Sequence, residues 1–143
     1  MQQDHISVYR TTVKAPIEKV WEALTQAEII ELYFFGSEQT TDWKIGRPIV
    51  WTGEYEGTTY KDTGVVLEFI PNEKLSYSYL SSWAGLEDKP ENYLVVTYEV
   101  TKIIAGTALT ITQSNYDETK KKDSEKNWAV VVDGLKKIVE PKQ

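Results

Sequence analysis

Aromatic side chains are the residues of this chain whose types and spacing best suit a chemical role. The sequence contains five Trp, nine Tyr and three Phe. Trp51 and Tyr55 stand at even spacing in one strand-like segment, as do Tyr77 and Tyr79 in another. Because side chains alternate between the two faces of a strand, each pair lies on one face of a sheet. We predict that these rings line a ligand cavity; simple core packing is the alternative.

Further residues have the parity or the helical position to join this predicted wall. Leu75 shares the parity of the tyrosine pair. Gln113 is interpreted first as an exposed strand-end residue, and as the polar group at the far end of the wall if it joins the wall. The complete predicted ligand-binding set is Trp51, Tyr55, Leu75, Tyr77, Tyr79, Trp83, Leu109, Ile111, Gln113, Trp128, Val132 and Leu135.

Acid–base and metal chemistry find little support. A pair of carboxylates from Glu54, Glu56, Asp62 and Glu68 would be needed for general acid and base work, and the parity of Glu54 places it on the solvent face. His5 is the only histidine and the chain has no cysteine. We therefore predict no catalytic residue, no metal and no cofactor, and favour a binding protein over an enzyme.

Length and composition limit the function classes further. The 143 residues suit one domain, 1–143, and 41% apolar with 27% charged residues is typical of a soluble globular protein. The net charge of −6 argues against nucleic acid as a partner. The sequence contains neither a run of about 18 apolar residues nor a signal-peptide pattern, so we expect a cytoplasmic protein without a membrane span, acting as a monomer.

The elements that must position the aromatics begin with a strand over Ile6 to Val13. Pro16 then starts a helix whose apolar stripe is Ile17, Val20, Trp21 and Leu24. A second short helix is expected from about 27 to 34. Short β-type runs broken by turn residues follow, which predicts a meander of five or six sequentially paired strands. Their expected bounds are Glu38–Asp42, Pro48–Tyr55, Thr59–Ile70, Lys74–Ser81, Asn92–Lys102 and Thr107–Tyr116.

Two further segments complete the chain. The stretch from Trp83 to Glu91 is expected to form a mobile cap over one end of the sheet. Residues 117–126, with three consecutive lysines, are expected to form a solvated loop before a closing helix from Ser124, its N-cap, to Glu140. Gly134 in this helix allows another surface to approach closely.

The chain resembles a known family along nearly its whole length. The residues that carry the likeness are Ala15 through Thr25 (APIEKVWEALT), Trp43 through Gly46 (WKIG), Gly64 through Glu68 (GVVLE), Pro71 through Leu75 (PNEKL) and the helix from Trp128 to Leu135. In these it is similar to the bacterial proteins that are like the C-terminal domain of the activator of the heat-shock-90 ATPase. They belong to the SRPBCC superfamily, which also includes START-type lipid-transfer domains and the birch-pollen allergen.

This resemblance implies an α+β helix-grip fold. In that fold a curved antiparallel sheet wraps around a long C-terminal helix, two short helices follow strand one, and a cavity lies between helix and sheet. It also implies a range of functions, so fold alone does not choose among them. We expect binding of a hydrophobic or aromatic small molecule, such as a lipid, polyketide or flavonoid-like metabolite, sensed under stress. The alternatives are an accessory factor of a heat-shock-90 chaperone and a cyclase or hydrolase-like enzyme that uses the cavity.

Overall fold

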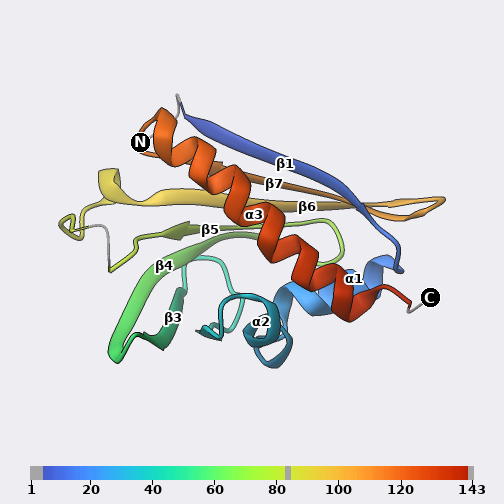
Figure 1. The fold of residues 1–143 in the computed structure, drawn as a ribbon, viewed down its shortest axis with the longest axis horizontal. Coiled ribbons are helices and arrows are strands. Elements are labelled where there is room, and N and C mark those ends of the chain that lie inside the picture. The colour runs from blue at the N-terminus through green and yellow to red at the C-terminus, as the bar shows by residue number, and fades with distance from the viewer. Residues whose placement is uncertain (1–4, 83–84, 142–143) are drawn as a thin grey trace.

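The computed structural model describes residues 5–82 and 85–141. These residues form an α+β architecture of one antiparallel sheet, three α-helices and a 3-10 turn (Figure 1). The elements are β1 (Ile6–Val13), α1 (Ile17–Thr25), α2 (Ala27–Tyr33), β2 (Glu38–Thr40), β3 (Pro48–Tyr55), β4 (Thr58–Ile70), β5 (Lys74–Tyr79), η1 (Pro90–Asn92), β6 (Leu94–Ile103), β7 (Gly106–Ser114) and α3 (Glu118–Val139).

The sheet has the strand order β1-β7-β6-β5-β4-β3-β2. Six strands pair with their neighbours in chain order, which confirms the predicted meander. β1 instead pairs with β7, so the first and last strands lie together, with Ile6 opposite Ser114 and Val13 opposite Thr107. The expected strand bounds hold to within about two residues.

The sheet is curved, and part of the bend falls in β4. Its first half pairs with β3 and its second half with β5, and the register shifts between Val66 and Glu68. Beside this irregularity, a Cβ atom on Gly64 would lie 1.7 Å from the carbonyl oxygen of Ser78. Only glycine permits this approach of the two backbones, and a bulge next to it bends the strand.

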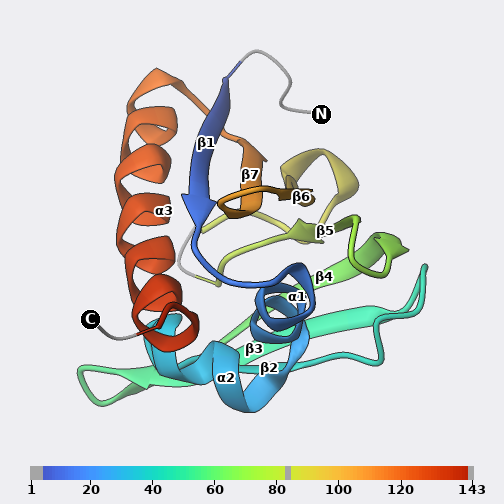
Figure 2. The same cartoon turned by 90° about the vertical axis from the view of Figure 1, so that its right-hand side faces the viewer.

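The two short helices pack at the base of the sheet, as the resemblance implied (Figure 2). In α1 the predicted stripe is largely confirmed, because Val20, Trp21 and Leu24 are buried and Ile17 packs against the core. Pro16 was expected at the first helical position, but it is the N-cap residue just before the helix, since its backbone is extended. Proline fixes only φ, which both positions accept.

The closing helix α3 begins six residues before the expected start at Ser124. Asp117 is its N-cap: the side chain accepts a hydrogen bond of 2.8 Å from the Lys120 N–H. The predicted lysine-rich loop at 117–126 is therefore wrong. A capping aspartate and Glu118 in the first turn both stabilise a helix start, so exposed lysines are tolerated on the outer face. Ser124 is instead a buried residue inside the helix.

α3 lies across the concave face of the sheet (Figures 1 and 2). Its buried residues towards the C-terminal end, among them Val132, Leu135 and Val139, belong to the main hydrophobic core. The close approach predicted at Gly134 is confirmed, since a Cβ there would meet the Cβ of Tyr33 in α2 at 3.0 Å. None of the helices in the described ranges has the length and apolarity needed to cross a membrane.

Candidate functional site

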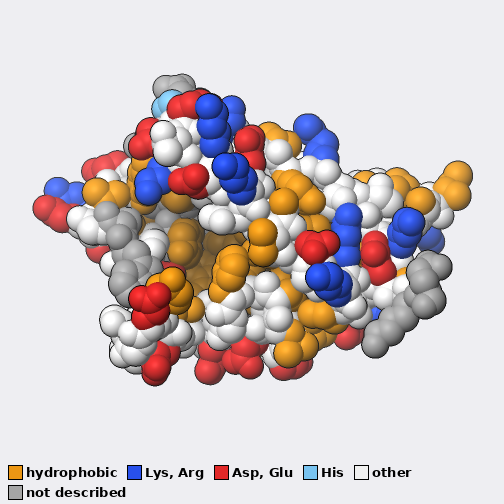
Figure 3. Space-filling model, in the orientation of Figure 1, with side chains coloured by type: hydrophobic (Ala, Val, Ile, Leu, Met, Phe, Trp, Pro, Cys, Tyr) orange, Lys and Arg blue, Asp and Glu red, His pale blue; other side chains and the backbone are white. Residues whose placement is uncertain are grey.

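A cavity of about 330 Å³ opens between the N-terminal half of α3 and the concave face of the sheet. Figure 3 shows a hollow lined by hydrophobic side chains in this region. The wall combines the sheet, the helix and the connection between α2 and β2. The lining residues are Phe34, Phe35, Ser37, Trp51, Glu54, Tyr55, Tyr60, Asp62, Tyr77, Tyr79, Val96, Gln113, Ser124, Asn127, Trp128 and Val131.

Trp51 is the centre of the aromatic wall on the sheet side. Its ring centroid lies 5.1 Å from those of both Tyr77 and Tyr79, with planes inclined by 50° and 78°. Its indole N–H donates to Gln39 Oε1 on the neighbouring strand at 2.9 Å. The ring is therefore fixed by packing and by one hydrogen bond, which gives the wall a defined shape.

Trp128 forms the corresponding surface on the helix side. Its ring packs edge-on against Tyr98 of β6 and against Phe34, with ring centroids 5.7 and 5.9 Å apart. Tyr98 in turn shares a hydrogen bond of 3.0 Å with the hydroxyl of Tyr77. Aromatic residues thus connect helix, sheet and the α2–β2 connection around the cavity.

Asp62 places a carboxylate in the otherwise largely apolar wall. It lies on β4 directly opposite Trp51 and is only 6% exposed. Oδ2 accepts a hydrogen bond of 2.9 Å from the Tyr79 hydroxyl, while Oδ1 accepts from the backbone N–H and the hydroxyl of Ser82 at 2.8 and 2.9 Å. Three donors hold the charged group in place, as burial requires.

The tyrosine hydroxyls of the cavity stay protonated at neutral pH. Burial raises the pKa of Tyr77 well above its usual range, and the hydrogen bond shared with Tyr98 only partly offsets this. Burial is also the main cause of the raised pKa of Tyr79, to which the negative charge of Asp62 adds. Neither phenol can therefore serve as a base near pH 7.

A polar network closes the end of the cavity near the start of α3. Gln113 Oε1 accepts from the Trp128 indole at 2.9 Å, and its Nε2 donates to Asn115 Oδ1 at 2.9 Å. The hydroxyls of Ser7 and Ser124 lie 2.9 Å apart. Gln113 is therefore not an exposed strand-end residue, because its amide is tied to both the helix and the sheet.

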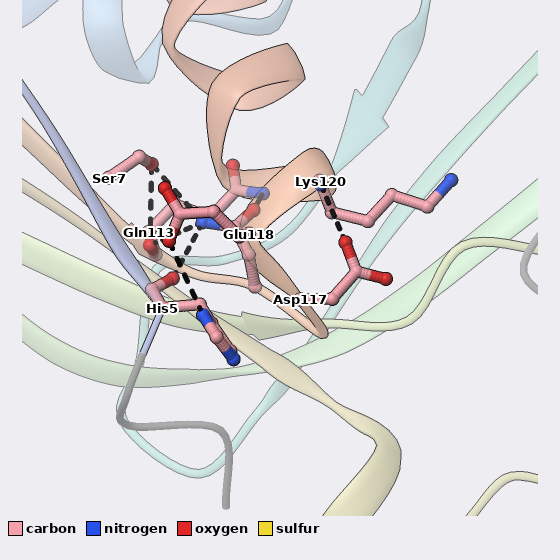
Figure 4. A network of polar contacts seen from close by, with 7 residues as sticks. His5, Ser7, Gln113, Asp117, Glu118 and Lys120 are labelled. Carbon is pink, nitrogen blue, oxygen red and sulfur yellow. Dashed lines mark hydrogen bonds and ion pairs between the residues drawn. The ribbon is translucent and has the colours of Figure 1, made fainter.

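Figure 4 shows the outer part of this network, where β1 begins and β7 ends beside the first turn of α3. His5 Nδ1 lies 3.8 Å from Glu118 Oε1, an ion-pair distance and too long for a hydrogen bond. Asp117 caps the helix here through the Lys120 N–H. His5 is on the far side of the network from the cavity, which it does not line.

The structure brings together half of the residues predicted from the sequence. Trp51, Tyr55, Tyr77, Tyr79, Gln113 and Trp128 all line the cavity. Five others are buried in the core instead, because the strands and the helix continue past the cavity to where α3 packs closely on the sheet. These are Leu75, Leu109, Ile111, Val132 and Leu135. Trp83 lies outside the described residues.

Glu54 departs from the sequence prediction. It was expected to face solvent away from the pocket, but it lies at the cavity mouth while remaining exposed. At the end of β3, just before the turn, both strand faces border the opening, so parity no longer separates cavity from solvent. The neighbouring Tyr55, 62% exposed, stands at the same mouth.

Sequence reasoning missed several lining residues. Asp62 was considered only as an acid, although it has the parity of Val66, a buried residue of the same strand. That parity was the available signal. Tyr60 lies against Gly53, where a Cβ would meet its hydroxyl at 2.5 Å, and reaches the Ser37 hydroxyl at 2.6 Å. No pattern in the sequence indicates this cross-strand contact.

Metal chemistry finds no site in the described part of the chain: no three His, Cys, Asp or Glu side chains there are grouped so as to hold an ion. The only buried carboxylate in the cavity wall, among the described residues, is Asp62. Its oxygens already accept three hydrogen bonds. The arrangement is best suited to enclosing a flat or apolar molecule and meeting its polar groups at Asp62 and Gln113.

Known structures with this fold differ in how closely they match. The solution structure of ChR145 from Cytophaga hutchinsonii is 45% identical, with a TM-score of 0.84 over 96% of this chain and 95% of that one. The Aha1 dimer from Colwellia psychrerythraea is 21% identical, with a TM-score of 0.72 over 94% and 96%. DynU16, a protein of the dynemicin biosynthetic locus, is 19% identical, with a TM-score of 0.76 over 94% of this chain and 47% of that one.

At 21% and 19% identity, the last two structures show only that this chain has the same fold. A comparison with curated proteins gives no match. The family model described as activator of Hsp90 ATPase homolog 1-like protein matches residues 14–140, which include both short helices, six of the seven strands and all of α3. The chain belongs to this family.

Proposed function

We propose that this protein binds an apolar, aromatic small molecule in the cavity between α3 and the sheet. The observation that carries the proposal is a space of about 330 Å³ with eight aromatic side chains among the described residues of its wall. This volume falls at the lower end of the range of about 300 to 1,000 Å³ for small-molecule sites. A flavonoid-like or polyketide-like ring system suits its size and shape better than a long lipid chain.

The family and one structural neighbour support the proposal without identifying the guest. DynU16 comes from a biosynthetic locus, which agrees with a small organic molecule as the guest of this fold. We also expect the protein to act as a cytoplasmic monomer, and its ligand to be a metabolite that accumulates under stress. Light scattering in solution tests the monomer, and the ligand extracted from stressed cells tests the link to stress.

A cavity-blocking variant gives the sharpest test. Asn127 lines the cavity from an exposed position on α3, so Asn127→Trp should fill the space without disturbing the core. Lys126→Trp is the matched control, because Lys126 is the adjacent, exposed residue outside the cavity. Calorimetric titration with a flavonoid and polyketide panel should show binding to the wild type and the control only. Equal binding by the Asn127→Trp variant would contradict the proposal.

The family match also favours a second candidate, an accessory role for a heat-shock-90 chaperone. The measurement is the ATPase rate of a bacterial heat-shock-90 protein with and without this chain. An increased rate together with co-purification would support the role. An unchanged rate and no association would remove it.

The third candidate, a cyclase or hydrolase-like enzyme, is supported by one observation. A carboxylate, Asp62, does lie in the cavity wall. Asp62 is the buried one of the two lining carboxylates, so an activity that uses it as the base should be abolished by Asp62→Asn, measured as turnover of an ester or polyketide substrate. Unchanged turnover in that variant would exclude Asp62 as the base.

A further inference from the structure

The charged side chains that line the cavity, in the part of the chain that the structure describes, are all acidic. Two lining side chains are carboxylates, Asp62 in the wall and Glu54 at the mouth, and no Lys, Arg or His lines the cavity in the described ranges 5–82 and 85–141. The chain as a whole has a net charge of −6. A guest therefore enters a region of negative potential, which favours cations over anions.

An acidic guest would meet two obstacles. Its carboxylate would lose water on entering the cavity, and the described wall offers no cationic side chain in compensation. It would also approach the charge of Asp62, which three hydrogen bonds hold in place. Like charges at short range in a partly buried site repel strongly. Fatty acids and other carboxylates are therefore poor candidates for the guest.

A positively charged nitrogen would meet favourable groups at the same place. The rings of Trp51, Tyr77 and Tyr79 meet at inclined angles, so they present faces and edges in several directions. A cation over the face of such a ring is attracted by its quadrupole, most strongly for tryptophan. Asp62 stands opposite Trp51 across the strand pair, which adds a full negative charge beside the rings.

The hydrogen bonding of Asp62 leaves room for such a contact. An ionised carboxylate has about four acceptor sites, and the described contacts use three of them. Tyr79 donates to Oδ2, so the carboxylate and the ring that line the cavity are held as one unit. A fixed acceptor next to fixed rings costs little entropy when a ligand binds.

We propose that the guest of this cavity carries a cationic nitrogen, as an amine or a quaternary ammonium group, on an aromatic body, and that the cavity excludes carboxylates. The inference rests on the proposed binding function and adds the charge class of the ligand. The nitrogen lies among Trp51, Tyr79 and Asp62, and the aromatic body extends towards Trp128.

Three probes with one aromatic body test the charge preference on the unmodified protein. They are trimethyl(2-naphthylmethyl)ammonium, 2-naphthalenemethanol and 2-naphthoate. Calorimetry should rank them in this order, with the ammonium at least about tenfold tighter than the carboxylate. The indole N–H signals of Trp51 and Trp128 should shift on binding, which places the probe in the cavity. Equal affinity for the ammonium and the carboxylate would overturn the inference.

Two variants give independent readouts. Glu54→Lys, at the exposed mouth, should improve binding of 2-naphthoate several-fold, whereas Glu22→Lys, an exposed residue of α1 outside the cavity, should not. Asp62→Asn should lower the affinity for the ammonium relative to that for the neutral alcohol. If all three probes bind alike, only the charge inference is lost. If none binds, the proposed function falls and the inference falls with it.

Discussion

Asp62 and Tyr79 form the contact on which the polar character of the cavity depends. The tyrosine hydroxyl donates to the carboxylate at 2.9 Å, and both side chains line the cavity. A buried carboxylate needs its donors, because an unpaired charge in such surroundings costs several kcal/mol. The same pair supports the fold and presents a charged acceptor to a ligand.

Replacing Tyr79 by phenylalanine tests the strength of this contact. The ring remains, but Asp62 loses one of its three donors, so Tyr79→Phe should lower the free energy of unfolding by about 1 to 3 kcal/mol. Urea denaturation followed by circular dichroism measures the change. Tyr55→Phe, at the exposed cavity mouth, should change stability by less than about 0.5 kcal/mol. A Tyr79→Phe effect no larger than this control would show that the hydrogen bond is not structural.

The sequence predicted the aromatic residues of the cavity wall better than its polar residues. Alternation along β3 and β5 is a local property, and it placed Trp51, Tyr77 and Tyr79 on the cavity face. The place of Asp62 in the cavity wall depends on contacts between segments. These are the register between β3 and β4 and the hydrogen bond from the Ser82 backbone N–H to the carboxylate. Neither contact can be predicted from the residue spacing within a single segment.

Among the elements, α3 decides where the cavity ends. Its C-terminal half packs on the core through Val132, Leu135 and Val139, while its N-terminal half covers the open space through Trp128 and Ser124. This difference explains why core-facing residues of the same stripe do not all line the cavity. Apolar periodicity identifies the buried face of a helix, but it contains no information about the distance to the sheet.

Gly134 should be essential to the contact between α3 and α2. A Cβ at this position would meet Tyr33 at 3.0 Å, so Gly134→Leu must push the helices apart, at a cost of about 1 to 3 kcal/mol. The gain in helix propensity over glycine, up to about 1 kcal/mol, offsets only part of this. Thermal unfolding measures the result. Lys137→Leu, at an exposed site of the same helix, should leave the melting temperature nearly unchanged. An unchanged melting temperature in Gly134→Leu would contradict the close contact.

Most elements were predictable because each has a local signal. Glycine and proline mark the turns of the meander, and the stripe of α1 repeats at helical spacing. The start of α3 was misplaced because a run of lysines indicates solvent exposure and not backbone conformation. Asp117 was the decisive residue, since its side chain caps the helix.

For the whole molecule, two buried and two partly buried tyrosines make stability sensitive to alkaline pH. Burial raises the pKa values of Tyr33, Tyr77, Tyr79 and Tyr98 above the usual value of about 10. The contribution of these protonated phenols to the free energy of unfolding is fully present below a pH of about 10. Above it the unfolded chain loses phenolic protons that the native state retains, so stability falls by about 1.4 kcal/mol per pH unit for each such tyrosine.

Urea unfolding at a series of pH values, with ultraviolet absorbance of tyrosinate, measures this decline. The buried phenols should ionise only together with unfolding, in one cooperative step. Tyr77→Phe should make the alkaline decline shallower, because it removes one of the four groups. Gradual ionisation of all tyrosines in the folded protein would contradict the burial of their hydroxyls.

The pairing of β1 with β7 has a consequence for how the molecule is made. Ser7 donates a hydrogen bond to the Gln113 carbonyl across 106 positions of sequence, and closing so long a loop slows folding. The hairpins from β2 to β7 follow chain order and can form as a nascent chain lengthens. β1 finds its partner strand only after β7 has left the ribosome, and α3 follows later still. The apolar concave face of the sheet therefore stays exposed through most of translation.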